Sequence, residues 1–331
     1  MPSTPPSSAP TKWLVGAPPD SPLAEVAIVA LRARLAAIRL CVPLAAKHSS
    51  EDHEHVHQLR VWTRRGAAAF DVFAECLPRR RAARVKRQLK RLRRAANDAR
   101  DLDVILLRFR DQASHPEAEA WLSKLQSQRD AAQRPLVAIH KRLKRAGRFD
   151  RRVQRMFRRI RQRESSGQSG ATPFGSWAQA ALRSTVADFF AEVPNDQSDL
   201  HALHAFRIQG KRLRYAIELL ATAFPPPLTE ELYPIIESMQ TRLGELNDAV
   251  TFSGRLPDWI AEADSPGEAE YLHTLLGQEQ ARLEPMRLDF LAWSAPRLER
   301  LRSGFALLDA TDAEPPASDH SAHPPADSPT G

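Results

Sequence analysis

The chain of 331 residues contains 48 lysines and arginines against 40 aspartates and glutamates, and its formal charge is +8. Its two cysteines, Cys41 and Cys76, are too few for a disulfide framework or a four-cysteine metal module. The most apolar stretch, residues 23–46, contains four charged side chains and a proline, which excludes a membrane-spanning helix.

Both ends of the chain and one central segment are poor in apolar residues. Residues 1–22 and 306–331 are rich in proline, serine and aspartate, so we expect two disordered tails. The N-terminal tail also lacks the charged and apolar regions of a signal peptide, so we expect a cytoplasmic protein. Glycine and serine in residues 164–175 predict a flexible linker, which divides the folded part into residues 23–163 and 176–305.

Apolar residues between these segments recur at helical spacing, as Val85, Leu89 and Leu92 do. We therefore predict an all-α fold of two four-helix bundles, one in each half of the chain. In the first half the expected helices cover about residues 23–46, 54–76, 79–111 and 115–163, the last broken near Pro135. In the second half they cover about residues 176–192, 199–223, 228–262 and 267–305. Trp62 and Phe70 are expected in the core.

The two halves share a pair of motifs. The pattern H-x-x-R-x-x-x-[RK]-R begins at His57 and again at His204, 147 residues later. Further along, Asn-Asp-Ala begins at Asn97 and again at Asn247, 150 residues later. Two motifs in the same order at nearly constant spacing indicate an internal duplication. We therefore expect the two bundles to be pseudo-symmetric.

Positive charge gathers on helix faces in the first half, because residues 47–165 contain 32 basic and 14 acidic side chains. Residues at positions 0, +3 and +7 share one face of a helix. In the two motif helices these are His57, Arg60 and Arg64, and His204, Arg207 and Lys211. Another single face, on the expected helix 79–111, carries Arg80, Arg84, Arg87, Arg91 and Arg94, with Lys90 beside it. Residues 141–163 add twelve basic side chains and one acidic one, so the pattern favours a polyanionic partner.

These motifs, with Ala-Arg-Asp-Leu-Asp at 99–103, Lys-Arg-Leu-Arg-Tyr at 211–215 and Leu-Gly-Glu-Leu-Asn-Asp at 243–248, resemble the CHAD family, the conserved histidine α-helical domain. The resemblance covers about residues 22–305. It implies an all-α protein of two helical bundles whose basic surface binds inorganic polyphosphate. Some members associate with bacterial polyphosphate granules, and this sequence, without a CYTH barrel, is similar to a stand-alone member.

The resemblance implies which residues bind polyphosphate. They are His57, Arg60, Arg64 and Arg65 in the first motif and His204, Arg207, Lys211, Arg212 and Arg214 in the second. The basic helix between the motifs adds Arg84, Arg87, Lys90, Arg91 and Arg94. Arginine suits this ligand because its planar fork donates two hydrogen bonds to one phosphate. For the two histidines we give equal weight to a structural hydrogen bond with Asp98 or Asp248.

Two other functions remain open. The same charges would suit the backbone of RNA or DNA, although the sequence shows no basic-aromatic motif for base stacking. The second alternative is metal chelation by His48, His53, His55 and His57, which we consider less favourable because histidines two apart do not face one another on a helix. No nucleotide-binding, hydrolase or metalloprotease motif is present, so we expect no enzyme, catalytic residue, metal or cofactor, and no membrane partner.

Overall fold

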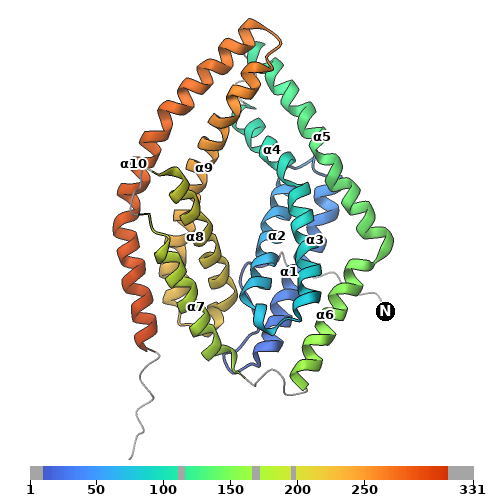
Figure 1. Ribbon diagram of the computed structural model, residues 1–331, viewed down its shortest axis with the longest axis vertical. Helices are drawn as coiled ribbons and strands as arrows, with labels where there is room; N and C mark the ends of the chain where they lie inside the picture. The colour runs from blue at the N-terminus through green and yellow to red at the C-terminus, as the bar shows by residue number, and fades with distance from the viewer. Residues whose placement is uncertain (1–9, 111–115, 166–171, 195–198, 312–331) are drawn as a thin grey trace, which may run out of the picture.

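The computed structural model describes residues 10–110, 116–165, 172–194 and 199–311, and these residues form α-helices without a β-strand (Figure 1). Helices in the first half are α1 (Leu23–Lys47), α2 (Glu54–Val72), α3 (Arg79–Ala95), α4 (Asn97–Phe109), α5 (Pro116–Ala146) and α6 (Arg148–Ser165). Those in the second half are α7 (Phe174–Ala191), α8 (Leu200–Leu220), α9 (Tyr233–Ala261) and α10 (Pro266–Thr311). Short helical turns cover Ala74–Cys76, Ala221–Ala223 and Leu228–Leu232. The predicted all-α fold is therefore confirmed.

The first half contains more helices than the four that we predicted. The expected helix 79–111 is divided at Ala96 into α3 and α4. The expected helix 115–163 is broken at Gly147, between α5 and α6. It is not broken near Pro135, which lies inside α5. Gly147 has a φ of 50°, in the left-handed region that favours glycine, so the chain can change direction there.

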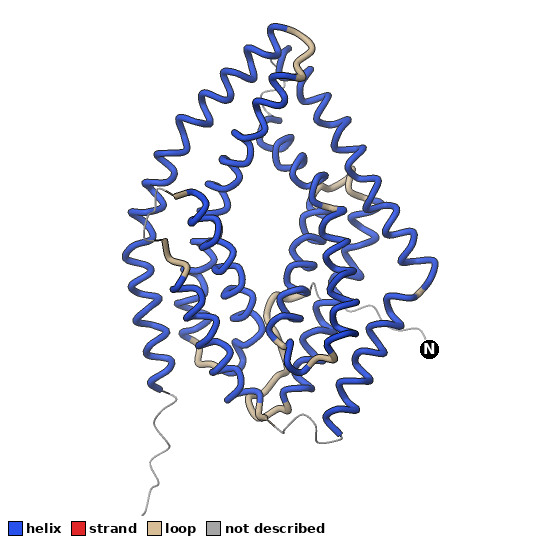
Figure 2. The backbone as a smooth tube through the Cα atoms, viewed as in Figure 1, coloured by secondary structure: helices blue, strands red, loops and turns tan. Residues whose placement is uncertain are grey.

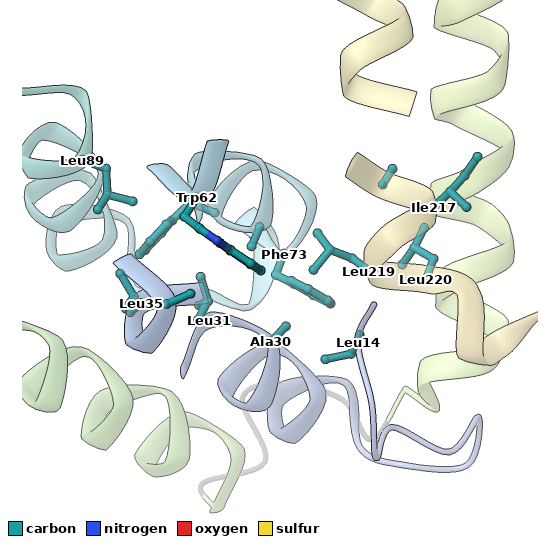
Figure 3. Packing of buried hydrophobic residues seen from close by; sticks show 14 of the residues in the cluster. Leu14, Ala30, Leu31, Leu35, Trp62, Phe73, Leu89, Ile217, Leu219 and Leu220 are labelled. Atoms are coloured by element: carbon teal, nitrogen blue, oxygen red, sulfur yellow. The ribbon is translucent and has the colours of Figure 1, made fainter. Parts of the chain in front are cut away.

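One hydrophobic core runs through both halves of the chain. Phe73 at the end of α2 lies next to Leu219 of α8, and Leu31 of α1 and Leu220 of α8 belong to the same cluster (Figure 3). Trp62 belongs to the same core with 4% of its surface exposed, as predicted, and Phe70 is buried as well. Because burying each such side chain contributes about 1.5–3 kcal/mol, the shared core fixes how the halves meet at this end.

An aromatic cluster joins the two halves at the opposite end of the molecule. Trp121 of α5 and Phe109 of α4 meet Phe252 of α9, and the ring centroids of Phe109 and Phe252 are 5.1 Å apart. Figure 2 shows the two sets of helices coming together at both ends of the long axis. The halves are therefore held at two separate places rather than by one central interface.

The start of the chain differs from the expected disordered tail. Leu14 is 3% exposed, and its backbone N–H donates to the carbonyl oxygen of Glu218 at 2.9 Å. The buried Arg34 donates to the carbonyl oxygen of Lys12, and Trp13 packs on Tyr233. Trp13 and Leu14 supply the apolar anchors that a disordered tail lacks, so the segment from residue 10 is packed against the helices.

The structure describes only part of the C-terminal tail and of the linker that we predicted. Residues 306–311, which we assigned to the C-terminal tail, are the last residues of α10. Residues 1–9 and 312–331 of the tails, and 166–171 of the linker, lie outside the described residues. Their disorder stays a prediction, as does the internal duplication.

Gly210, within the second motif helix, lies directly against Gln240 of α9. A Cβ atom at Gly210 would clash with the side-chain amide of Gln240 on α9, so glycine permits the close approach of α8 and α9. Gln240 is 6% exposed, and neither its amide nitrogen nor its oxygen has a hydrogen-bond partner among the described residues.

Gln240→Met should raise the free energy of unfolding by about 1 kcal/mol, measured by urea denaturation, because it removes two unpaired polar atoms. Gln278→Met, on an exposed position of α10, should change it by less than about 0.5 kcal/mol, and a loss of stability in Gln240→Met would contradict the prediction.

Candidate polyanion-binding site

The two motif helices, α2 and α8, pack against each other although they come from different halves of the chain (Figure 1). Arg65 of α2 donates two hydrogen bonds to the buried carboxylate of Glu218 on α8, at 2.7 Å from Nε and 3.0 Å from Nη2. The hydroxyl of Tyr233 donates to the same carboxylate at 2.9 Å. Arg65, which we expected to bind polyphosphate, is therefore engaged in a buried ion pair between the halves.

Four cations come together beside this ion pair. They are Arg64 of α2 and Arg207, Lys211 and Arg214 of α8, which we call the inter-half cluster. Burial, and then the neighbouring charges of Arg207, Arg64 and Arg214, lower the pKa of Lys211 to about 7. Such an effect requires that the positive charges of both helices lie close together.

The charge of the inter-half cluster is poorly neutralised. The Nε atoms of Arg64, Arg207 and Arg214 are buried, and none has a hydrogen-bond partner among the described residues. Arg214 lies 4.0 Å from a carboxylate oxygen of Glu237, at the limit of an ion pair. Buried polar atoms are nearly always hydrogen-bonded, so these three guanidinium groups have a donor that no described residue satisfies.

Helix α9 packs against α8, the second motif helix, and contacts two of its motif residues. The guanidinium of Arg207 lies against Gly244, where an added Cβ atom would be 3.4 Å from Nη2. Burial lowers the pKa of Arg207, and the nearby Asp248 opposes this effect. Nδ1 of His204 is 2.7 Å from the amide oxygen of Asn247, so the ring nitrogen donates this bond. A neutral His204 has no second donor, and it would contact a phosphate as a donor only when protonated.

In the first motif, Arg60 and His57 differ in how freely they could meet a ligand. Arg60 donates to the carbonyl oxygen of Asn97 at 3.0 Å and pairs with Asp101 at 3.2 Å, so part of its charge is neutralised. Burial first, and then Arg100, lowers the pKa of His57, while Glu54 raises it. In the part of the chain that the structure describes, the His57 ring forms no hydrogen bond, so Asp98 is not its partner.

Arg100 of α4 lies beside the candidate site, and our sequence prediction did not include it. It lies close enough to His57 to lower the pKa of that imidazole, and its Nη1 is buried without a hydrogen-bond partner among the described residues. The Ala-Arg-Asp-Leu-Asp run at 99–103 contained the signal, because it marked this arginine beside the repeated Asn-Asp-Ala motif.

The basic residues of α3 lie on its exposed side, as their spacing predicts. They lie opposite the buried Val85 and Leu89. In the described ranges, no ion pair links them to a carboxylate. These residues are Arg84, Arg87, Lys90, Arg91 and Arg94. Arg212 of α8 is exposed too and donates to the side chain of Gln209 at 3.1 Å. Binding of a polyanion by these six residues stays a prediction.

The histidines near the start of α2 give little support to metal chelation. Nδ1 of His48 lies 2.9 Å from a carboxylate oxygen of Glu51, which accounts for one of the four. Among the residues with described positions, no group of three or more His, Cys, Asp or Glu side chains is placed to hold a metal ion. The same part of the chain contains no helix that is long and apolar enough to cross a membrane.

The fold and the site together define an all-α protein with paired basic motif helices. Residues 29–257 match the CHAD domain, and the chain therefore belongs to the CHAD domain family. This confirms the resemblance that the two motifs indicate.

Two solved structures show the same fold. The crystal structure of the CHAD domain from the plant Ricinus communis is similar with a TM-score of 0.63 and 21% identity, covering 92% of this chain and 98% of that chain. PptA from Streptomyces chartreusis is similar with a TM-score of 0.52 and 17% identity, covering 83% of this chain and 100% of that chain. No match was found among curated proteins.

Proposed function

We propose that this protein binds inorganic polyphosphate, and that the inter-half cluster is the centre of the binding site. The observation that carries the proposal is the meeting of Arg64 with Arg207, Lys211 and Arg214, four cations from both halves with three unpaired buried Nε donors. A phosphate chain supplies closely spaced negative charges and many hydrogen-bond acceptors. Arginine binds such oxygens with two parallel hydrogen bonds and stays charged at any working pH.

Partial burial makes this cluster more effective than an exposed basic patch. Ion pairs at the protein surface contribute only about 0–1 kcal/mol because water and salt screen them. Half-buried charges are screened less, and each hydrogen bond to a charged group contributes about 1.5–3 kcal/mol. Membership of the CHAD family supports the same ligand, since the family resemblance implies polyphosphate binding. Association with polyphosphate granules would follow from such binding.

Nucleic acid is the second candidate, because its backbone offers the same charge. The aromatic residues within two positions of the cluster in sequence are Trp62, Phe206 and Tyr215, which are 4%, 1% and 6% exposed, so none offers an open ring for base stacking. Competition of labelled long-chain polyphosphate against duplex RNA at fixed salt separates the two functions. We expect polyphosphate to displace RNA and the affinity to fall steeply with salt, whereas a clear preference for RNA would contradict the proposal.

Lys211 makes the binding dependent on pH. Burial and neighbouring cations lower its pKa from 10.5 to about 7, so above pH 7 it is mostly neutral in the free protein. A bound polyanion favours the charged form, so binding takes up a proton and the affinity falls as the pH rises through about 7.

The same lowered pKa affects the folding stability of the free protein. Between about pH 7 and 10.5 the unfolded chain binds more protons at Lys211 than the folded chain, so the contribution of Lys211 to stability increases with pH.

Titration calorimetry of long-chain polyphosphate at several pH values, in buffers of different ionisation enthalpy, measures this proton uptake. We expect the affinity to fall by up to about tenfold per pH unit above the lowered pKa. In Lys211→Arg the side chain stays charged, and this part of the pH dependence should disappear. An identical pH profile for Lys211→Arg and the unaltered protein would show that Lys211 does not contact the ligand.

A further inference from the structure

A second group of arginines lies where α6 packs against α3. Helices α3 and α6 lie side by side, and Nη1 of Arg81 on α3 donates to the carbonyl oxygen of Arg155 on α6 at 3.3 Å. Arg84 follows Arg81 by one helical turn, and Arg152 and Arg159 lie one turn to either side of Arg155. All five side chains are exposed, and we call them the α3–α6 arginine group.

The positive charge of this group is not balanced by a carboxylate of the described residues. Within the described ranges, none of its five guanidinium groups forms an ion pair with a carboxylate. Asp150, in the first turn of α6, pairs instead with Arg39 of α1 at 3.2 Å. The apolar side of α6, which includes Val153 and Met156, is already buried in the core. Helix α6 therefore cannot insert an apolar face into a membrane, and an anion in water is the ligand that its exposed side fits.

The α3–α6 arginine group lies at one end of a series of packed helices that leads back to the inter-half cluster. Arg65–Glu218 links α2 to α8, and the ion pair of Lys86 with Asp71 links α3 to α2. Figure 1 shows α8, α2, α3 and α6 in this order across the molecule. The inter-half cluster lies between α8 and α2, and the arginine group lies between α3 and α6. About two helix-to-helix steps of roughly 8–10 Å each therefore separate the two contacts by roughly 16–20 Å.

We propose that the α3–α6 arginine group is a second contact for a polyphosphate chain held at the inter-half cluster, and that it makes the protein prefer long chains to short ones. This inference rests on the proposed function. A long chain that is bound at one contact meets the other at a high effective concentration, which strengthens binding roughly tenfold or more. Tripolyphosphate is too short to reach both contacts.

Two titrations, one with tripolyphosphate and one with long-chain polyphosphate, test the inference in the variant Arg152→Gln, Arg155→Gln, Arg159→Gln. Glutamine keeps the helix propensity of arginine at these exposed positions. We expect the ratio of long-chain affinity to tripolyphosphate affinity to fall about tenfold. Arg81→Gln with Arg84→Gln removes the same contact from α3 and should lower the ratio in the same direction, which guards against misfolding of one variant.

The matched control removes three exposed arginines that already have carboxylate partners, in Arg183→Gln, Arg300→Gln, Arg302→Gln. This control should keep the ratio of the unaltered protein. An unchanged ratio in both α3–α6 variants would overturn the inference while leaving the proposed function intact. Failure of the unaltered protein to bind either phosphate would overturn the proposed function itself. A loss of affinity for duplex RNA but not for polyphosphate would make the group a nucleic-acid contact and also contradict the inference.

Discussion

Reversing two charges of the inter-half cluster, in Arg64→Glu with Arg207→Glu, should weaken binding of long-chain polyphosphate by roughly 100-fold or more. One arginine comes from each half, and each has a buried Nε without a hydrogen-bond partner among the described residues. The double variant removes two charge-assisted contacts and adds two carboxylates that repel phosphate. Fluorescence anisotropy with labelled polyphosphate at fixed salt measures the loss.

The matched control for this double reversal is Arg300→Glu with Arg302→Glu on α10. Both control arginines are exposed and lie beside carboxylates, so the net charge changes equally but away from the cluster. We expect the control to weaken binding by less than about fivefold, as general electrostatic attraction decreases. Equal losses in the two double variants would mean that polyphosphate is bound by net charge alone, with no centre at the cluster.

Removing the buried carboxylate in Glu218→Ala should lower the free energy of unfolding by about 3–5 kcal/mol. Glu218 is 1% exposed and accepts hydrogen bonds from Arg65 and Tyr233. It also opposes the effect of burial on Arg34, whose pKa is lowered to about 10. Without this carboxylate, two buried guanidinium groups lose the negative charge that compensates them.

Urea denaturation followed by circular dichroism measures the effect of Glu218→Ala. Glu299→Ala is the control, because Glu299 is exposed and lies 3.9 Å from Arg302. The control should change stability by less than about 0.5 kcal/mol. A loss below about 1 kcal/mol for Glu218→Ala would show that the ion pair with Arg65 contributes little to joining the two halves.

The helices of this fold follow from sequence periodicity, whereas the joining of the halves does not. The spacing of Val85, Leu89 and Leu92 predicts which side of α3 is buried, and the structure confirms it. Arg65 and Glu218 are 153 residues apart, and a pairing at that distance leaves no mark in local periodicity. The packing of Leu14 was missed for the same reason, because its partners on α8 are far along the chain.

The candidate site could be predicted as a set of cationic faces but not as a set of free charges. The motif spacing places Arg60 and Arg64 on one face, and both are half-buried in the structure. Which of them keeps an unpaired charge depends on carboxylates from other elements. Asp101 partly neutralises Arg60 and Glu218 binds Arg65, while Nε of Arg64 stays unpaired among the described residues. Those pairings follow from tertiary packing rather than from the motif.

A crystal structure of the protein with tripolyphosphate tests most directly whether one helix from each half grips the same anion. We expect phosphate oxygens within hydrogen-bonding distance of Arg64 on α2 and of Arg207 on α8 in a single bound molecule. Tripolyphosphate bound elsewhere, with both of these guanidinium groups free of phosphate, would contradict the account.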